Sequence, residues 1–224
     1  MPLIIFLVEC GLELIPSQIK SYSAIKKNLV KNDYASLLLD NAIHHSAMVK
    51  LENKEKRGRP DIIHNCLLHA LGSPCSKRGL LSFYVHTIHD KIFQFHPDIK
   101  INRNYNRFKG LMAKLLIEGT ISFEGKNLIS EIKHPLGNFI KNIKKKDIML
   151  FSSRGRLIQH HLTIFPKDSS KNEVVIIGGF QKGFFSPKIL DIGKKLISIS
   201  QYSLDASIVV NKIINFYEIV NEII

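Results

Sequence analysis

The sequence predicts an α/β protein, and three observations support this prediction. Short apolar runs rich in β-branched residues are typical of buried strands in a parallel sheet, and they occur at residues 3–8, 148–151, 174–177 and 196–199. Stretches with apolar residues at helical spacing begin near Asp61 and near Ser203. With 224 residues and 45% apolar content, the chain can also bury a substantial core.

The first run, residues 3–8, is expected to be a buried first strand. It is too short to span a membrane, has no basic leader, and runs into Glu9 rather than a small-residue cleavage site. Cys10, Cys66 and Cys75 form no CxxC pair, which predicts small core residues in a reducing compartment. We therefore expect a cytoplasmic protein without a membrane partner.

Residues 11–16 suggest a turn, and residues 18–29 carry a weak helical pattern. His44 and His45 are adjacent, but no third ligand stands at a suitable spacing, so no metal site is predicted.

The segment from Arg57 to His64 should open a helix. Pro60 fixes its own φ and pushes Arg59 toward an extended conformation, so the helix should begin at about Asp61 with Arg59 held outside it. An arginine and a carboxylate thus stand two residues apart on a shaped turn. Taken alone, this segment is better explained as an ordinary capped helix with Asp61 in its first turn.

Residues 80–88 and 91–95 alternate well enough for a β-hairpin that turns at His89 and Asp90. Their threonine, tyrosine and phenylalanine content suits strands.

The charge of the chain predicts a polyanionic partner. Thirty-two lysines and arginines against nineteen acidic residues give +13, and residues 100–146 hold eleven basic residues and three glutamates, a net +8. If a helix begins near Asn104, Arg103 and Arg107 project from one face and suit phosphate oxygens. A solvated basic helix with Phe108, Met112 and neighbouring apolar residues on its buried side is the alternative, and both can hold.

Residues 126–146 are expected to form a basic connection, with a helix around 128–132, that ends in three lysines at 144–146. After Asp147 the apolar strand-like runs begin. Gly178 and Gly179 directly follow one of them, and Gly183 lies in the next loop. Residues 203–223 predict a long amphipathic closing helix with Asp205 in its first turn.

Several stretches together resemble the SPOUT-superfamily enzymes that methylate nitrogen 1 of a pseudouridine in small-subunit ribosomal RNA and act in small-subunit biogenesis. These stretches, in the order of the family, are Leu12-Glu-Leu-Ile-Pro16 after Glu9, Leu38-Leu39-Asp40 with His44, Arg57-Gly-Arg-Pro-Asp-Ile-Ile-His64, Arg103 to Met112, Ile176-Ile-Gly-Gly-Phe180 and Ile199-Ser-Gln-Tyr-Ser-Leu-Asp-Ala-Ser207. The resemblance covers nearly the whole chain. It departs from the family at Lys100, where relatives carry arginine, and in the loop Phe180-Gln-Lys-Gly-Phe-Phe185.

The resemblance implies a single domain, residues 1–224, with a SPOUT-type parallel sheet and a deep C-terminal trefoil knot. Residues 40–146 would contain the basic RNA-binding elaboration with the β-hairpin, and residues 147–224 the knotted part. S-adenosylmethionine would be the cofactor, held mostly by backbone groups, because glycines allow close approach of the main chain. The cofactor-binding residues would be Gly178, Gly179, Gly183, Leu196, Ile197, Ser198, Ile199, Ser200, Gln201, Leu204 and Ala206.

The resemblance also implies RNA binding by Arg59, Lys100, Arg103, Arg107 and Lys109. Asp61 would either accept a proton during catalysis or orient Arg59 through an ion pair. The implied partners are small-subunit ribosomal RNA, a second copy of the chain, and ribosomal proteins of the assembling subunit, with a nucleolar location in a eukaryote. A non-enzymatic rRNA-binding assembly factor with a vestigial cofactor pocket is the alternative.

Overall fold

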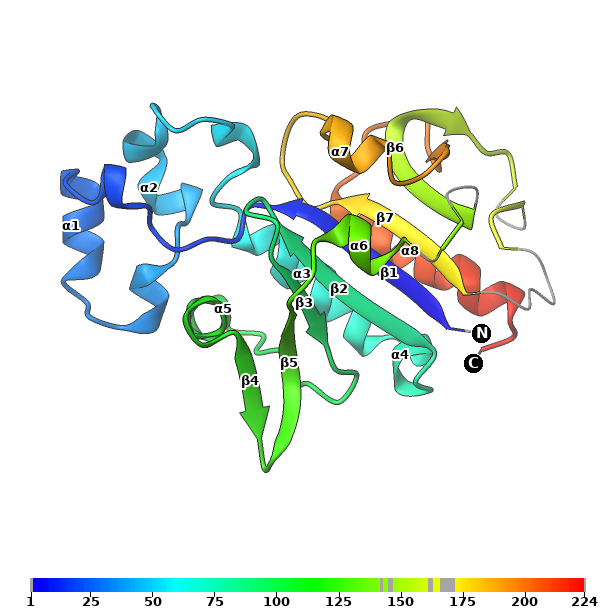
Figure 1. Ribbon diagram of the computed structural model, residues 1–224, viewed down its shortest axis with the longest axis horizontal. Coiled ribbons are helices and arrows are strands. Elements are labelled where there is room, and N and C mark those ends of the chain that lie inside the picture. The colour runs from blue at the N-terminus through cyan, green and yellow to red at the C-terminus, as the bar shows by residue number, and fades with distance from the viewer. Residues whose placement is uncertain (1, 142, 145–146, 161–162, 166–171, 224) are drawn as a thin grey trace.

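One mixed β-sheet forms the centre of the computed structural model, which describes residues 2–141, 143–144, 147–160, 163–165 and 172–223 (Figure 1). Within that part of the chain its order is β4-β5-β3-β2-β1-β7-β6-β8. The strands are β1 (Leu3–Cys10), β2 (Leu81–Thr87), β3 (Ile92–Phe95), β4 (Thr120–Phe123), β5 (Lys126–Ile132), β6 (Ile148–Leu157), β7 (Glu173–Gly178) and β8 (Lys195–Ser198).

The sheet is parallel in only one of its halves, which corrects the expected parallel sheet. Strands β2, β1, β7, β6 and β8 run parallel to their neighbours, whereas β3, β5 and β4 pair antiparallel. The physical reason is connection length: β2 and β3 are joined by a tight turn, which only antiparallel neighbours allow. The α/β class itself is confirmed.

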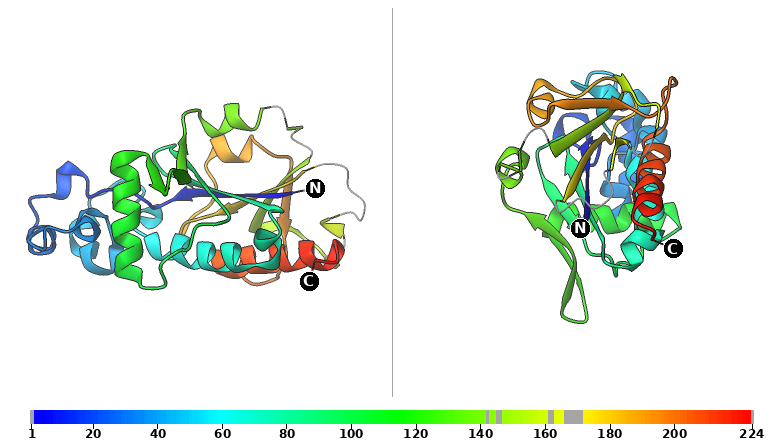
Figure 2. Two further views of the ribbon diagram at one scale, coloured as in Figure 1. Left: turned by 90° about the horizontal axis from the view of Figure 1, so that it is seen from below. Right: turned by 90° about the vertical axis from the view of Figure 1, so that its right-hand side faces the viewer.

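Helices cover both faces of the parallel half (Figure 2). Helices α3 and α8 lie on one face, and α6 and α7 lie on the other, while α1, α2 and α5 stand at the end beyond β1 and β3 (Figures 1 and 2). The helices are α1 (Ser23–Leu29), α2 (Asn41–Met48), α3 (Pro60–Gly72), α4 (Pro74–Lys77), α5 (Tyr105–Glu118), α6 (Leu136–Phe139), α7 (Pro187–Leu190) and α8 (Ala206–Val220), with short 3-10 helices η1 (Ser17–Ile19), η2 (Tyr34–Leu37) and η3 (Lys54–Lys56). None of the described helices is long and apolar enough to cross a membrane.

The position of β1 between two layers of helices explains why its sequence is apolar almost without interruption. Leu3, Ile5 and Leu7 are buried in the cluster that includes the inner sides of α3 and α8, while Phe6 and Val8 are buried in the cluster on the α6 and α7 side. A strand covered on both faces has no position for polar side chains. The run at residues 3–8 is therefore the buried first strand that the sequence predicts.

Three helix and strand boundaries agree with the predictions from sequence. Helix α3 begins at Pro60 with Arg59 as its N-cap, and α5 begins at Tyr105, where the Asn104 side chain caps the helix. The hairpin forms from β2 and β3. The closing helix α8 starts at Ala206 rather than Ser203.

The prediction of a helix around residues 128–132 is wrong, because these residues belong to strand β5. Phe95 of β3 pairs with Ile129, which is fully buried. Pairing with an existing strand decides the structure of this short apolar run, and β4 then extends the sheet without a clear signal of its own. Of the three lysines at 144–146, the last two lie outside the described residues.

Strand β6 bends around β8 at the edge of the parallel half. Ile197 of β8 pairs with Phe151 and again with Arg156, across a break in register. At the bend, a Cβ on Gly155 would lie 2.5 Å from the backbone of Ile197. Only glycine lets the two strands approach so closely.

Candidate active site

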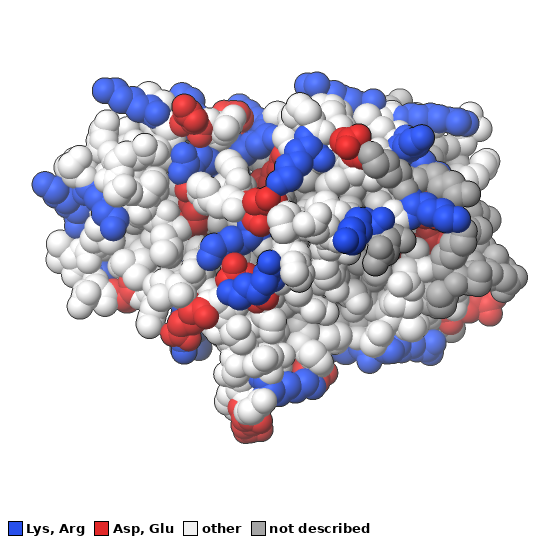
Figure 3. All heavy atoms as spheres, in the orientation of Figure 1, with Lys and Arg blue, Asp and Glu red and all other residues white. Residues whose placement is uncertain are grey.

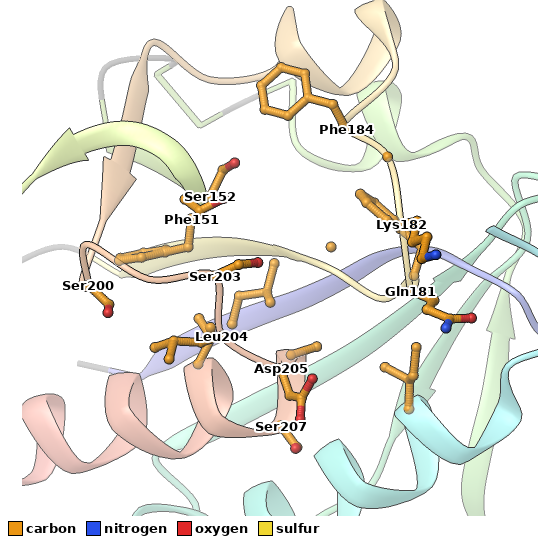
Figure 4. Close-up of a pocket in the computed structure, with 18 of the residues that line it drawn as sticks. Phe151, Ser152, Gln181, Lys182, Phe184, Ser200, Ser203, Leu204, Asp205 and Ser207 are labelled. Carbon is orange, nitrogen blue, oxygen red and sulfur yellow. The ribbon is translucent and has the colours of Figure 1, made fainter. Parts of the chain in front are cut away.

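A pocket of about 420 Å³ opens where β7 and β8 end and α8 begins. The carboxyl ends of parallel strands are the usual place for ligands in α/β proteins. In Figure 4, Gln181, Lys182 and Phe184 lie on one side of the pocket, Ser200 and Phe151 on the other, and Asp205 and Ser207 at the start of α8 below.

Arg59 and Asp61 form part of the wall of this pocket, opposite the strand ends. Their side chains join through two hydrogen bonds: Nε of Arg59 donates to Oδ1 of Asp61 at 2.8 Å, and NH2 donates to Oδ2 at 2.6 Å. This bonding raises the pKa of the Arg59 guanidinium against the opposing effect of partial burial. The helix start set by Pro60 thus presents a fixed positive group to the pocket.

The segment that leads into α5 contacts α3 one turn after this ion pair. A ring nitrogen of His64, Nε2, lies 2.7 Å from the carbonyl oxygen of Asn102, and the His64 ring stacks on Phe108 at 4.4 Å. These contacts attach the basic segment beside the pocket wall.

Lys100, Arg103 and Arg107 are exposed, and no carboxylate of the described residues pairs with them. Helix α5 begins where expected, but Arg103 precedes its N-cap, so the two arginines do not both project from one helix face. Figure 3 shows lysines and arginines spread over the whole visible face, with acidic side chains among them.

Lys109 differs from the other members of the predicted RNA-binding set. Its side chain is only 9% exposed, and its Nζ bonds to Oδ2 of Asp40 at 3.0 Å. The hydroxyl of Tyr105 donates to the same oxygen at 3.2 Å. Because the ammonium faces a buried carboxylate rather than solvent, Lys109 holds α5 against the start of α2, and we expect it not to contact RNA.

The predicted cofactor-binding residues divide into two groups. Eight of them line the pocket, although their assignment to a cofactor stays a prediction: Gly178, Gly183, Ile197, Ser198, Ile199, Ser200, Leu204 and Ala206. Gly179, Leu196 and Gln201 are not among its lining residues. A Cβ on Gly179 would lie 2.3 Å from Sγ of Cys10, so this glycine packs against the end of β1. Leu196 packs on the α6 and α7 side, and Gln201 is exposed.

Sequence reasoning assigned no role in the site to several groups of the wall, among them Phe151, Ser152, Lys182, Ser203 and Asp205. Each is an ordinary residue type without a spacing signal. Phe151 is the last residue of an apolar run and Ser152 follows it directly, and this position at the end of a predicted parallel strand was the one available clue.

Fold and pocket together define an α/β protein with a pocket of small-ligand size whose wall includes the ion-paired Arg59. The chain matches the EMG1/NEP1 methyltransferase family over residues 5–218. The ribosomal RNA small subunit methyltransferase Nep1 of Staphylothermus marinus is 37% identical over 216 residues, which cover 95% of this chain and 94% of that protein. Nep1 of Thermococcus kodakarensis is 36% identical and covers 96% of each chain.

A solved structure agrees with these sequence relatives. The crystal structure of Archaeoglobus fulgidus Nep1 bound to S-adenosylhomocysteine superimposes with a TM-score of 0.84 at 31% identity, covering 98% of this chain and 99% of that one. The protein belongs to the EMG1/NEP1 methyltransferase family.

Proposed function

We propose that the protein methylates nitrogen 1 of a pseudouridine in small-subunit ribosomal RNA, with S-adenosylmethionine as the methyl donor. One observation carries this proposal: Arg59 lies on the pocket wall, and the helix it precedes is bonded to the segment that bears Lys100 and Arg103. A small donor and a polyanionic substrate can therefore be held side by side. The names of the relatives, and the S-adenosylhomocysteine in the Archaeoglobus structure, support it.

The pocket suits S-adenosylmethionine. Its volume of about 420 Å³ falls within the usual range for small-molecule sites. Ile177 and Leu204 supply apolar wall, Ser200 and Ser203 supply hydroxyls, and the carboxylate of Asp205 favours a cationic ligand. When bound there, the donor supplies a methyl group already activated on sulfonium.

The chain contributes mainly positioning. Arg103 and Arg107 would bind phosphates, while Arg59 would hold the target nucleotide after it leaves the base stack. Holding two reactants in line accounts for much of the acceleration in such a transfer. Both carboxylate oxygens of Asp61 bond to Arg59, which favours the orienting role of Asp61 over that of proton acceptor.

The proposal includes a homodimer and a trefoil knot in residues 147–224, with residues 40–146 supplying the RNA contacts. The exposed apolar side chains of Tyr202 and Ile208, next to the pocket and at the start of α8, support a protein interface there. The match to the structure of Archaeoglobus fulgidus Nep1 over 98% of this chain supports a shared course of the chain in this region. Light scattering after size-exclusion chromatography tests the dimer.

Mass spectrometry of nucleosides tests the reaction. A small-subunit rRNA hairpin with one pseudouridine is incubated with the protein and S-adenosylmethionine, beside the same hairpin with uridine. We expect one methylated nucleoside from the pseudouridine hairpin and none from the control. Binding of the hairpin without S-adenosylmethionine binding, measured by calorimetry, and without methylation would instead favour the non-enzymatic assembly factor.

A further inference from the structure

The loop on one side of the pocket is bonded from behind by two charged residues of the first third of the chain. The loop, residues 180–186, follows β7, and Phe180 and Phe184 are among its residues in the wall. Glu9 and Lys56 line a separate small hollow on the other side of this loop. They are separated in sequence from the loop by more than a hundred residues, so only the fold brings them there.

Lys56 contacts the loop at two points. Its Nζ donates to the carbonyl oxygen of Phe184 at 2.6 Å and lies 4.5 Å from the centre of the Phe180 ring. The same ammonium donates to Oε2 of Glu9 at 2.7 Å. With its side chain 14% exposed, Lys56 makes these charged contacts largely out of water, where they are strongest.

Glu9 adds a third attachment, because its Oε1 accepts a hydrogen bond from the backbone N–H of Ser186 at 3.1 Å. The backbone of Glu9 has φ +54°, a left-handed conformation that is uncommon for residues other than glycine. The Glu9 N–H donates to Nδ1 of the buried His86 at 3.2 Å, and this bond helps to hold that conformation. Glu9 is thus aimed at the loop by its own strained backbone.

Besides Glu9 and Lys56, the loop contacts Arg154, which lies 4.7 Å from the centre of the Phe184 ring, and the Phe185 ring packs against those of Phe180 and Phe184. Gln181, Lys182 and Gly183 are exposed, and Gly183 has φ +108°, which gives this stretch wide conformational freedom. A wall that must order when a ligand binds weakens affinity, whereas a wall ordered beforehand does not. Fixing Phe180, Phe184 and Ser186 from behind orders the wall beforehand.

We propose that Glu9 and Lys56 are positioning residues for the cofactor: they clamp residues 180–186 in the shape that receives S-adenosylmethionine. This inference rests on the proposed function and deepens it, because it assigns cofactor affinity to two residues outside the pocket. Neither residue is among those that line the pocket.

The test compares Lys56→Met with Lys54→Met, a matched change at an exposed lysine of the same 3-10 helix. Calorimetry measures the Kd for S-adenosylhomocysteine, and steady-state assays with the pseudouridine hairpin measure KM and kcat. We expect Lys56→Met to raise the Kd and the KM for S-adenosylmethionine about tenfold, the effect of losing one charged hydrogen bond. The kcat and the Kd for RNA should stay within about twofold, as expected for a change in cofactor binding alone.

Two further variants separate positioning from general stability. Lys56→Arg keeps the charge and the donors, and should restore cofactor affinity. Glu9→Gln keeps the side-chain volume and should also raise the KM for S-adenosylmethionine with little change in kcat. If Lys56→Met lowers the Tm by more than about 5 °C, the Glu9→Gln result decides whether the clamp acts on cofactor binding. In Lys56→Met, hydrogen exchange should become faster at the amides of residues 181–186 and stay unchanged in β1.

The outcomes are distinguishable. Wild-type protein that binds no S-adenosylhomocysteine would overturn both the proposed function and the clamp. Wild-type binding with equal Kd values for wild type, Lys56→Met and Glu9→Gln would overturn the clamp alone. A drop in kcat at unchanged KM would also reject it.

Discussion

Arg59 and Asp61 stand two residues apart and are joined by two parallel hydrogen bonds, of 2.8 and 2.6 Å, on the wall of the pocket. This pairing uses both oxygens of the carboxylate. It fixes the guanidinium plane, so the direction of the remaining Arg59 donors is set by Asp61.

Asp61→Asn should therefore weaken RNA binding rather than methyl transfer. The amide keeps one acceptor but loses the charge, so we expect the Kd for the pseudouridine hairpin to rise about tenfold. The kcat at saturating RNA should change less than about threefold. Glu55→Gln, at an exposed carboxylate, is the control. A fall in kcat of about a hundredfold at unchanged RNA affinity would identify Asp61 as the proton acceptor instead.

Arg107→Ala should weaken RNA binding regardless of sequence. Arg107 is exposed and no described carboxylate pairs with it, so it is free to bind a phosphate. Losing one such contact should reduce the slope of log K against log salt by about 0.7 to 0.9. Filter binding of the hairpin across several salt concentrations measures this slope. Lys77→Ala, on α4, should leave it unchanged, and an unchanged slope for Arg107→Ala would exclude the contact.

Lys109→Met should destabilise the fold and spare RNA binding. It leaves the Asp40 carboxylate, whose side chain is 4% exposed, without its ammonium partner. Removing one member of a buried pair costs about 3 to 5 kcal/mol in the free energy of unfolding. Urea unfolding measures this loss. Lys114→Met, at an exposed lysine of the same helix, should change stability by about 0.5 kcal/mol or less. Loss of RNA affinity without loss of stability would return Lys109 to the RNA surface.

Stability should fall as the pH drops below about 6.5, the usual pKa of histidine. Burial lowers the pKa of His44, with Asp40 and Lys109 nearby, and of His86, with Asp90, Glu9 and Lys188 nearby. Both histidines have a lower pKa in the folded protein than in the unfolded chain. At pH values between the folded and the unfolded pKa, the unfolded chain therefore binds more protons than the folded protein. The stability is fully present above pH 6.5 and is lost as the pH falls toward the folded pKa values.

Urea unfolding at pH 7.5 and pH 5.5 checks this dependence. Each histidine can contribute a slope of up to about 1.4 kcal/mol per pH unit. The double variant His44→Gln, His86→Gln should show a shallower dependence, whereas His160→Gln, at an exposed histidine, should not. An equal slope in wild type and double variant would assign the pH dependence to other groups.

Much of the fold can be predicted from local sequence patterns. The errors in that prediction arise where contacts between distant segments decide the structure. Pro60 alone places the start of α3, and continuous apolar runs locate β1 and β7. Residues 128–132 are too short to separate helix from strand by periodicity, and only pairing with β3 decides.

The same limit applies to the site. The sequence shows that Lys109 is basic, but not that Asp40, far away in the chain, faces it. Likewise Gly179 follows Gly178 and is expected in the same loop, yet it packs against Cys10 at the end of the neighbouring strand β1. Which side of a strand end faces a pocket is settled by packing between distant segments, and the chain order does not reveal it.

The central place of β1 also has a consequence for synthesis. Leu3 pairs with Leu81 on one side and with Glu173 on the other, so one edge of the earliest strand waits for a segment made much later. While the nascent chain lacks β7, that edge presents unpaired backbone N–H and C=O groups between apolar side chains, a template for aggregation. Translation that stalls before β7 therefore leaves a fragment suited to chaperones and proteases rather than a smaller working enzyme.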